Sequence, residues 1–202
     1  FKNQIDENGE YVQHSTNYHR LMLQSALWVH TIGETTGTTP LGNEEYQRLG
    51  MAVTWLASQL DEQSGKVPNL GANDGALIFP FSSAVFSDYR PVLQAGARAF
   101  LGDGRHIQNE EMSLWFGLAD KHSSNNPPHT SQGIIHAKDS WASIRAMHYN
   151  SRPSHADQLH CELWWHGYNI ARDAGTYRYN DSPPWDNSLT STLVHNTVSI
   201  NM

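Results

Sequence analysis

The chain has 202 residues, of which 16% are charged, and a formal net charge of −7. This length can bury the core of one large domain or two small ones. No basic stripe is present, which argues against a nucleic-acid partner, and no stretch approaches the roughly 20 apolar residues of a membrane span. The acidity gives no long-range attraction for a polyanion, so an anionic ligand would need a local cluster of cations. Twelve histidines and seven tryptophans are present, and we expect most of the tryptophans to fill the core.

The first half of the sequence predicts helices. Ser15 or Thr16 can cap a first helix that runs to about Ile32. Asn43 can cap a second helix, whose apolar stripe predicts packing against the first. The stripe consists of Tyr46, Leu49, Val53, Leu56 and Leu60.

A long segment punctuated by glycine and proline, residues 61–87, follows the second helix and contains Asn69, Asn73 and Asp74. A run of this length inside a compact domain is usually functional. The alternative is a surface loop that Asx turns hold in place. A third helix is predicted from Pro91 to about Leu101 with Asp88 as its cap, and a short fourth helix over residues 109–118.

The second half predicts strands. Residues 121–132 are polar and disfavour helices, so we place a boundary there, between a helical part at 1–125 and a β part at 126–202. Strands are predicted at 133–137, 141–149 and 159–165. A turn at His166-Gly167 then leads into a returning strand at 168–172. Helices followed by strands indicate the α+β class.

Three residues of the β part could share one metal ion. If the last two strands pair antiparallel, His155 and Asp173 come to the same end of the hairpin, and His195 follows later. Two imidazoles and a carboxylate suit zinc, although the histidines could equally be ordinary residues at strand ends. The single cysteine, Cys161, excludes an intrachain disulfide, and its apolar neighbours predict a buried thiol.

Several spaced motifs resemble one known family. They are DENGEYVQHSTNYHRLML (6–23), GANDGALIFPFSSAVFSDYRP (71–91), HADQLHCELWWHGYNIARDAGTYRY (155–179) and VHNTVSI (194–200). Their order is similar to that of the heparinase II/III-like polysaccharide lyases. The resemblance implies part of an incomplete (α/α) toroid followed by the first strands of an antiparallel β-sandwich. It also implies β-elimination on a uronic-acid polysaccharide, such as a heparin-, alginate- or capsule-like polymer, in the bacterial periplasm or outside the cell.

The resemblance also implies roles for individual residues. Tyr18 would be the acid and base, and His19 would support it or transfer protons. Elimination also requires a group that neutralises the C5 carboxylate. The family's motif for that task matches no segment here, and we expect it to precede Phe1 in a longer protein. Some relatives carry a histidine two residues before the first metal ligand, where this chain has Pro153.

Further site residues follow less directly. Asn73, Arg90 and Tyr177 are candidate substrate-binding residues, although Arg90 could instead bond Asp74 or Asp88 and brace the loop. The resemblance implies that His155, Asp173 and His195 hold a structural zinc beside the cleft between the two parts.

Two alternatives to a lyase remain. One is a non-catalytic carbohydrate-binding or structural domain that keeps the lyase fold, which Pro153 and the acidity favour. The other is zinc hydrolysis, for which Glu162 would be the base.

Overall fold

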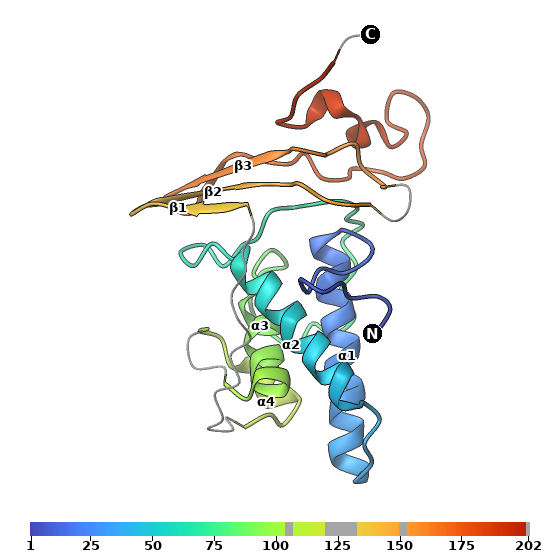
Figure 1. Cartoon of the computed structure of the whole chain (residues 1–202), viewed down its shortest axis with the longest axis vertical. Helices are drawn as coiled ribbons and strands as arrows, with labels where there is room; N and C mark the ends of the chain where they lie inside the picture. The colour runs from blue at the N-terminus through green and yellow to red at the C-terminus, as the bar shows by residue number, and fades with distance from the viewer. Residues whose placement is uncertain (104–106, 120–132, 150–152, 201–202) are drawn as a thin grey trace.

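A computed structural model describes residues 1–103, 107–119, 133–149 and 153–200. Helices form one layer, and a four-stranded antiparallel sheet lies across one end of them (Figure 1). The helices are α1 (Thr16–Thr36), α2 (Asn43–Ser58), α3 (Arg90–Gly96) and α4 (Glu111–Trp115), with a π-helix, η1 (Ala97–Leu101), after α3. The α+β class is therefore confirmed. The predicted boundary between residues 125 and 126 lies outside the described residues.

Helix α1 begins where the sequence predicts, because the Ser15 hydroxyl accepts a hydrogen bond from the Tyr18 N–H. It runs past Ile32 to Thr36 and ends at Gly37, whose φ of 66° favours glycine. The Ser15 hydroxyl also donates to the Ala72 carbonyl at 2.5 Å, which ties the start of the helix to the following long loop.

The predicted apolar stripe of α2 lies in the core between the helices. The largest fully buried apolar side chains of this layer come from α1, α2 and α3: Leu23, Leu27, Leu49, Leu56 and Leu93. Gly42 rather than Asn43 is the N-cap of α2, and the Glu45 carboxylate accepts a hydrogen bond from its N–H. Tyr89 rather than Asp88 is the N-cap of α3, although the Asp88 carboxylate accepts a hydrogen bond from the Arg90 N–H.

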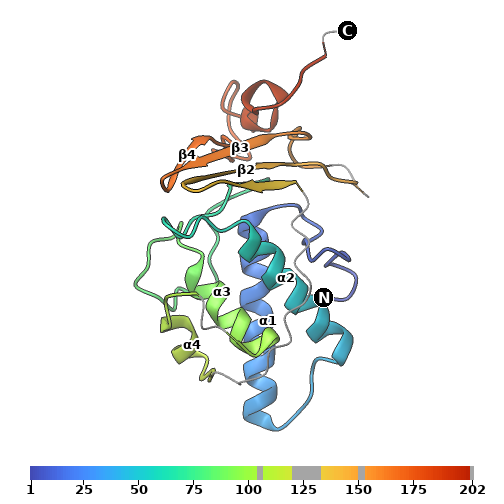
Figure 2. The same cartoon turned by 60° about the vertical axis from the view of Figure 1, so that its left-hand side comes forward.

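The sheet has the order β1 (Ile134–His136), β2 (Ser140–Ile144), β3 (Cys161–Trp165) and β4 (Tyr168–Ala171). The predicted turn at His166-Gly167 is present, since Trp165 pairs with Tyr168 across it. Strand β3 begins later than predicted because Leu159 has a φ of 61°, which an extended strand cannot accommodate. The C-terminal segment, with η2 (Ser188–Thr190) and η3 (Thr192–Val194), lies on the far side of the sheet from the helices (Figure 2).

Two stacked tryptophans connect the sheet to the helical layer. Trp141 and Trp164 pair across β2 and β3 and stack with ring centroids 5.4 Å apart. The Trp141 indole N–H donates to the carboxylate of Asp61, just after α2. The prediction of a buried Cys161 is wrong: the thiol is exposed, and the opposite face of β3, with Glu162 and Trp164, is buried instead. No described helix has the length and apolarity needed to cross a bilayer.

Candidate metal centre and active site

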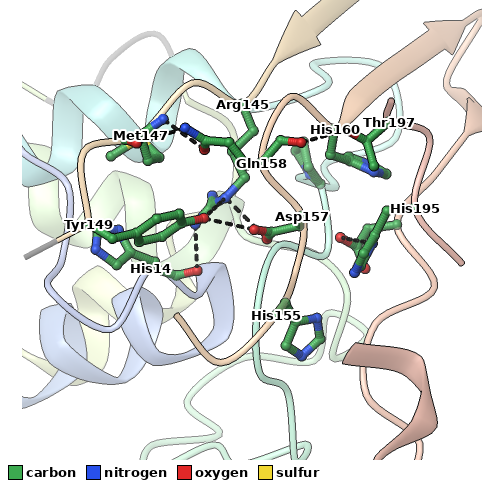
Figure 3. Close-up of polar contacts among 12 residues, drawn as sticks. His14, Arg145, Met147, Tyr149, His155, Asp157, Gln158, His160, His195 and Thr197 are labelled. Atoms are coloured by element: carbon green, nitrogen blue, oxygen red, sulfur yellow. Dashed lines mark hydrogen bonds and ion pairs between the residues drawn. The ribbon is translucent and has the colours of Figure 1, made fainter. Parts of the chain in front are cut away.

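The three predicted metal ligands lie together. His155 precedes β3, Asp173 follows β4, and His195 follows η3. One ligand atom from each lies within 4.8 Å of the others, and the side chains are almost fully buried, at 3%, 1% and 8% exposed. Figure 3 shows His155 and His195 on separate segments of the chain. The group could therefore hold a metal ion.

The polar atoms of this group are unsatisfied, which is the strongest sign of a ligand. His155 Nδ1, Asp173 Oδ2 and both ring nitrogens of His195 are buried without a hydrogen bond. His195 Nδ1 lies 3.3 Å from Asp173 Oδ2, but the angles are not those of a hydrogen bond. Because unpaired buried polar groups are costly, a cation shared by these atoms accounts for their placement. The donor set of two imidazoles and one carboxylate fits zinc.

The electrostatics of two of the ligands also suit a metal. Burial lowers the pKa of His155, which keeps its imidazole neutral. Burial alone would raise the pKa of Asp173, but His195 and the Gly175 N–H outweigh it, so the pKa is lowered and the carboxylate is ionised. Burial opposes protonation of His195 too, yet the Asp173 carboxylate raises its pKa. A neutral imidazole and an ionised carboxylate are the forms that bind metals.

Glu162 holds in place the segments that carry the candidate metal ligands. Its Oε1 accepts a hydrogen bond from the Asp173 N–H at 2.8 Å and another from His160 Nε2 at 3.2 Å, while Oε2 accepts from Asn169. His160 Nδ1 accepts from the Asn196 N–H, so the ring proton is on Nε2. Since both oxygens of Glu162 are engaged, this residue positions the ligand segments rather than acting as a free base.

The turn that carries Asp173 requires a glycine. Gly175 has a φ of 71°, and a Cβ there would lie 2.0 Å from Nδ2 of Asn69. Its N–H donates to Asp173 Oδ1 at 2.7 Å. The absence of a side chain therefore lets the loop of residues 69–74 lie directly against the metal-binding turn.

That loop also reaches the predicted acid and base. The Tyr18 hydroxyl donates to Asp74 Oδ2 at 2.9 Å and lies 3.4 Å from the Tyr179 hydroxyl. The contact with Tyr179, together with burial and Asp74, raises the pKa of Tyr18, so it is a neutral phenol at pH 7. Sequence reasoning missed the roles of Asp74 and Tyr179. No local pattern could reveal them, because Tyr179 is 161 residues away from Tyr18.

The loop links this group to the metal ligands. The Asn73 N–H donates to Thr176 Oγ1, which lies 3.1 Å from His155 Nε2. The Asn73 side chain donates to Asn69 and accepts from the Gly75 N–H. The loop is therefore held by an Asx turn and also lies at the site, so the two interpretations of residues 61–87 are compatible.

His19 is not brought to the Tyr18 hydroxyl. Its ring is fully buried among the helices, stacks on Trp55 with centroids 5.0 Å apart, and donates from Nε2 to the Ala52 carbonyl. Burial lowers its pKa to about 4, so it is neutral.

Neither of the other two predicted substrate-binding residues contacts the Tyr18 hydroxyl. Arg90 binds the Asp88 carboxylate through Nε and Nη2, the latter at 2.6 Å. This is the alternative role that the sequence allowed for Arg90, in which it braces the loop. Tyr177 is 64% exposed and lies beside Trp185 and the Arg178 guanidinium.

A buried ionic network joins the sheet to the helical layer beside the site (Figure 3). Arg145 Nε lies 3.1 Å from Asp157 Oδ2, and its Nη2 donates to the His14 carbonyl at 3.1 Å and lies 3.7 Å from Glu10 Oε1. The Tyr149 hydroxyl donates to Asp157 Oδ1 at 2.7 Å. Burial opposes the charge on Arg145, but the two carboxylates raise its pKa, so the guanidinium remains charged.

This network spans the two elements that carry the site. Asp157 is two residues after His155, and His14 immediately precedes Ser15, the N-cap of the helix that carries Tyr18. The sequence indicated Arg145 only as a position in an alternating strand. Its ionic role depends on carboxylates from both parts of the chain, Glu10 before α1 and Asp157 before β3.

Comparison with known proteins identifies relatives of both the sequence and the fold. Residues 120–202 match the family model described as Heparinase II/III-like, C-terminal. The fold is similar to a solved structure of a heparinase III with methylated lysines, with a TM-score of 0.57 and 17% identity. The match covers 98% of this chain and 30% of the heparinase III, so the chain spans about 30% of that protein's length. A search of curated proteins gives no match. The resemblance that the motifs predict is confirmed.

Proposed function

We propose that this chain, whose residues 120–202 are a heparinase II/III-like C-terminal domain, is part of a lyase that cleaves a uronic-acid polysaccharide by β-elimination. In this proposal residues 1–125 form part of an incomplete (α/α) toroid and residues 126–202 begin a β-sandwich. The fold similarity to heparinase III supports this division. Because such polymers lie outside the cytoplasm, the proposal places the protein in the periplasm or outside the cell.

One observation carries the proposal: a single loop contacts both the tyrosine and the metal group. Asp74 binds the Tyr18 hydroxyl, and its neighbour Asn73 reaches His155 through Thr176. A phenol whose raised pKa keeps its proton, linked by one loop to a buried group that could hold a cation, suits a reaction that needs a proton donor next to an anionic sugar.

Tyr18 would protonate the departing glycosidic oxygen, since its raised pKa keeps the proton on the hydroxyl. Elimination also requires a base for the C5 proton. In this proposal Tyr18 would act as that base in its phenolate form and would then return the C5 proton to the departing oxygen, while the Asp74 carboxylate orients the hydroxyl through their 2.9 Å hydrogen bond. A phenol is a poor base until a nearby cation lowers its pKa, so this step depends on the charges that surround bound substrate.

The other predicted residues take supporting roles in this proposal. His19 fixes α1 against α2 through the Ala52 carbonyl. Asn73 orients the loop at the site, and Arg90 braces its end through Asp88. Tyr177 offers an exposed ring on which a sugar could stack.

The proposed cofactor is a structural zinc held by His155, Asp173 and His195. When bound, zinc would supply a fixed positive charge and cross-link the segments that carry these residues. The chain itself orients the ligands through Glu162 and Thr176.

The test measures product formation from alginate, heparan sulfate and chondroitin sulfate. The product is detected by the ultraviolet absorbance of its unsaturated uronate ends. We expect product with the full-length protein that contains this chain, and a loss of at least about 100-fold when that protein carries Tyr18→Phe, which removes the proton-transfer group. Tyr11→Phe is the matched control, because Tyr11 is partly buried in the same layer but outside the site. Equal rates for Tyr18→Phe and the control would reject Tyr18 as the acid and base.

A non-catalytic carbohydrate-binding domain is the second candidate. It is favoured by Pro153, which stands where some relatives have a histidine. Slower migration of an acidic polysaccharide in a gel, without unsaturated ends, would support it over the lyase.

A further inference from the structure

A cavity lies beside the metal group, since Asp173 is one of its lining residues. It has a volume of about 420 Å³ and opens between the loop of residues 66–89 and the β3–β4 hairpin. This volume lies within the range of small-molecule sites. Its walls combine cations, amides and aromatic rings, chiefly Lys66, Asn73, Trp164, Tyr168, Asn169 and Arg172.

The cavity gathers positive charge on an acidic protein. The chain has a net charge of −7, yet Lys66 and Arg172 both line this cavity. Both side chains are exposed, and neither forms an ion pair with any residue that the structure describes. Asp173 also lines the cavity, but its charge belongs to the metal group. Two uncompensated cations therefore remain for an anionic ligand.

The cavity adjoins the proposed reaction site. Asn73 lines it, and the next residue, Asp74, binds the Tyr18 hydroxyl. Asp173, which belongs to the group that could hold a metal, also lines the cavity. A polymer that crosses the Tyr18 group could therefore place a neighbouring sugar unit in this cavity.

We propose that this cavity is a subsite for one acidic sugar unit, in which Lys66 and Arg172 bind the carboxylate or sulfate. This inference rests on the proposed function for the choice of a polysaccharide ligand. It supplies the local cation cluster that an acidic protein needs to bind a polyanion.

Calorimetric binding of acidic oligosaccharides to the whole protein tests the subsite. The probes are an oligoglucuronate, its neutral methyl ester, and a sulfated but uronate-free oligosaccharide. We expect Lys66→Gln and Arg172→Gln each to weaken binding of the acidic probe about tenfold, with a smaller effect on the ester. Lys138→Gln is the control, since Lys138 is exposed and lies outside the cavity.

The outcomes separate this subsite from the lyase proposal. Tighter binding of the oligoglucuronate than of the sulfated probe would assign the subsite to a carboxylate, and the reverse order would assign it to a sulfate. Binding that Lys66→Gln and Arg172→Gln leave unchanged, or no binding by the whole protein, would overturn the subsite even if unsaturated product forms. Binding that responds to these variants, without unsaturated product, would retain the subsite and overturn the lyase.

Discussion

At the scale of single residues, the metal group depends on a few unsatisfied atoms. His155, Asp173 and His195 bury nitrogens and an oxygen that nothing else in the described chain satisfies. The burial of the Glu162 carboxylate costs little free energy, because both of its oxygens accept hydrogen bonds from the segments that it positions. The ligands thus have the outer partners that fix ring and carboxylate orientation in metal proteins.

We predict that the purified protein binds zinc and that His155→Ala weakens zinc binding by at least about 100-fold, since removal of an outer partner alone costs 10 to 100-fold. Metal content by mass spectrometry, and competition with a chelator, measure this. His136→Ala is the control, because His136 lies in β1 and outside the group. Equal zinc content in both variants would show that these three residues do not share one ion.

At the scale of elements, the site depends on how the strands and α1 are held together. Arg145 lies after β2, yet it contacts Asp157 before β3 and the His14 carbonyl before α1. All three side chains of the ionic cluster, those of Arg145, Asp157 and Glu10, are buried. Removal of one partner therefore leaves a buried charge without compensation.

We predict that Arg145→Met lowers the free energy of unfolding by about 3 to 5 kcal/mol, the usual cost of breaking a buried ion pair. Arg178→Met should lower it by less than about 1 kcal/mol, because the ion pair of Arg178 with Asp181 is exposed. Urea unfolding of the two variants measures the difference. Equal losses would indicate that the Arg145 network contributes no more than a surface pair.

The elements differ in how far the sequence could predict them. Local signals sufficed for α1, where Ser15 caps the first turn, and for the hairpin turn at His166-Gly167. They failed for the buried face of β3, where Glu162 is inside and Cys161 outside. Hydrophobicity alone favours the reverse, and only the hydrogen bonds from His160, Asn169 and Asp173 make the buried glutamate acceptable.

At the scale of the whole molecule, the candidate site combines Tyr18 at the start of α1 with residues of the β part, namely His155 before β3 and Asp173 after β4. The metal ligands could be predicted, because strand pairing brings His155 and Asp173 to one end of a hairpin and a family resemblance adds His195. The contact of Tyr18 with Asp74 and Tyr179 could not, since it depends on how a long loop and the C-terminal segment fold back onto α1.

The masses of the products formed from a defined uronate oligosaccharide test the central claim most directly. Elimination adds no water, so the masses of the two fragments should sum to that of the parent, and one fragment should carry the unsaturated end. Fragments whose masses sum to the parent plus one water would show hydrolysis and contradict the account. The absence of any fragment, with the oligosaccharide still bound, would contradict it in favour of a binding domain.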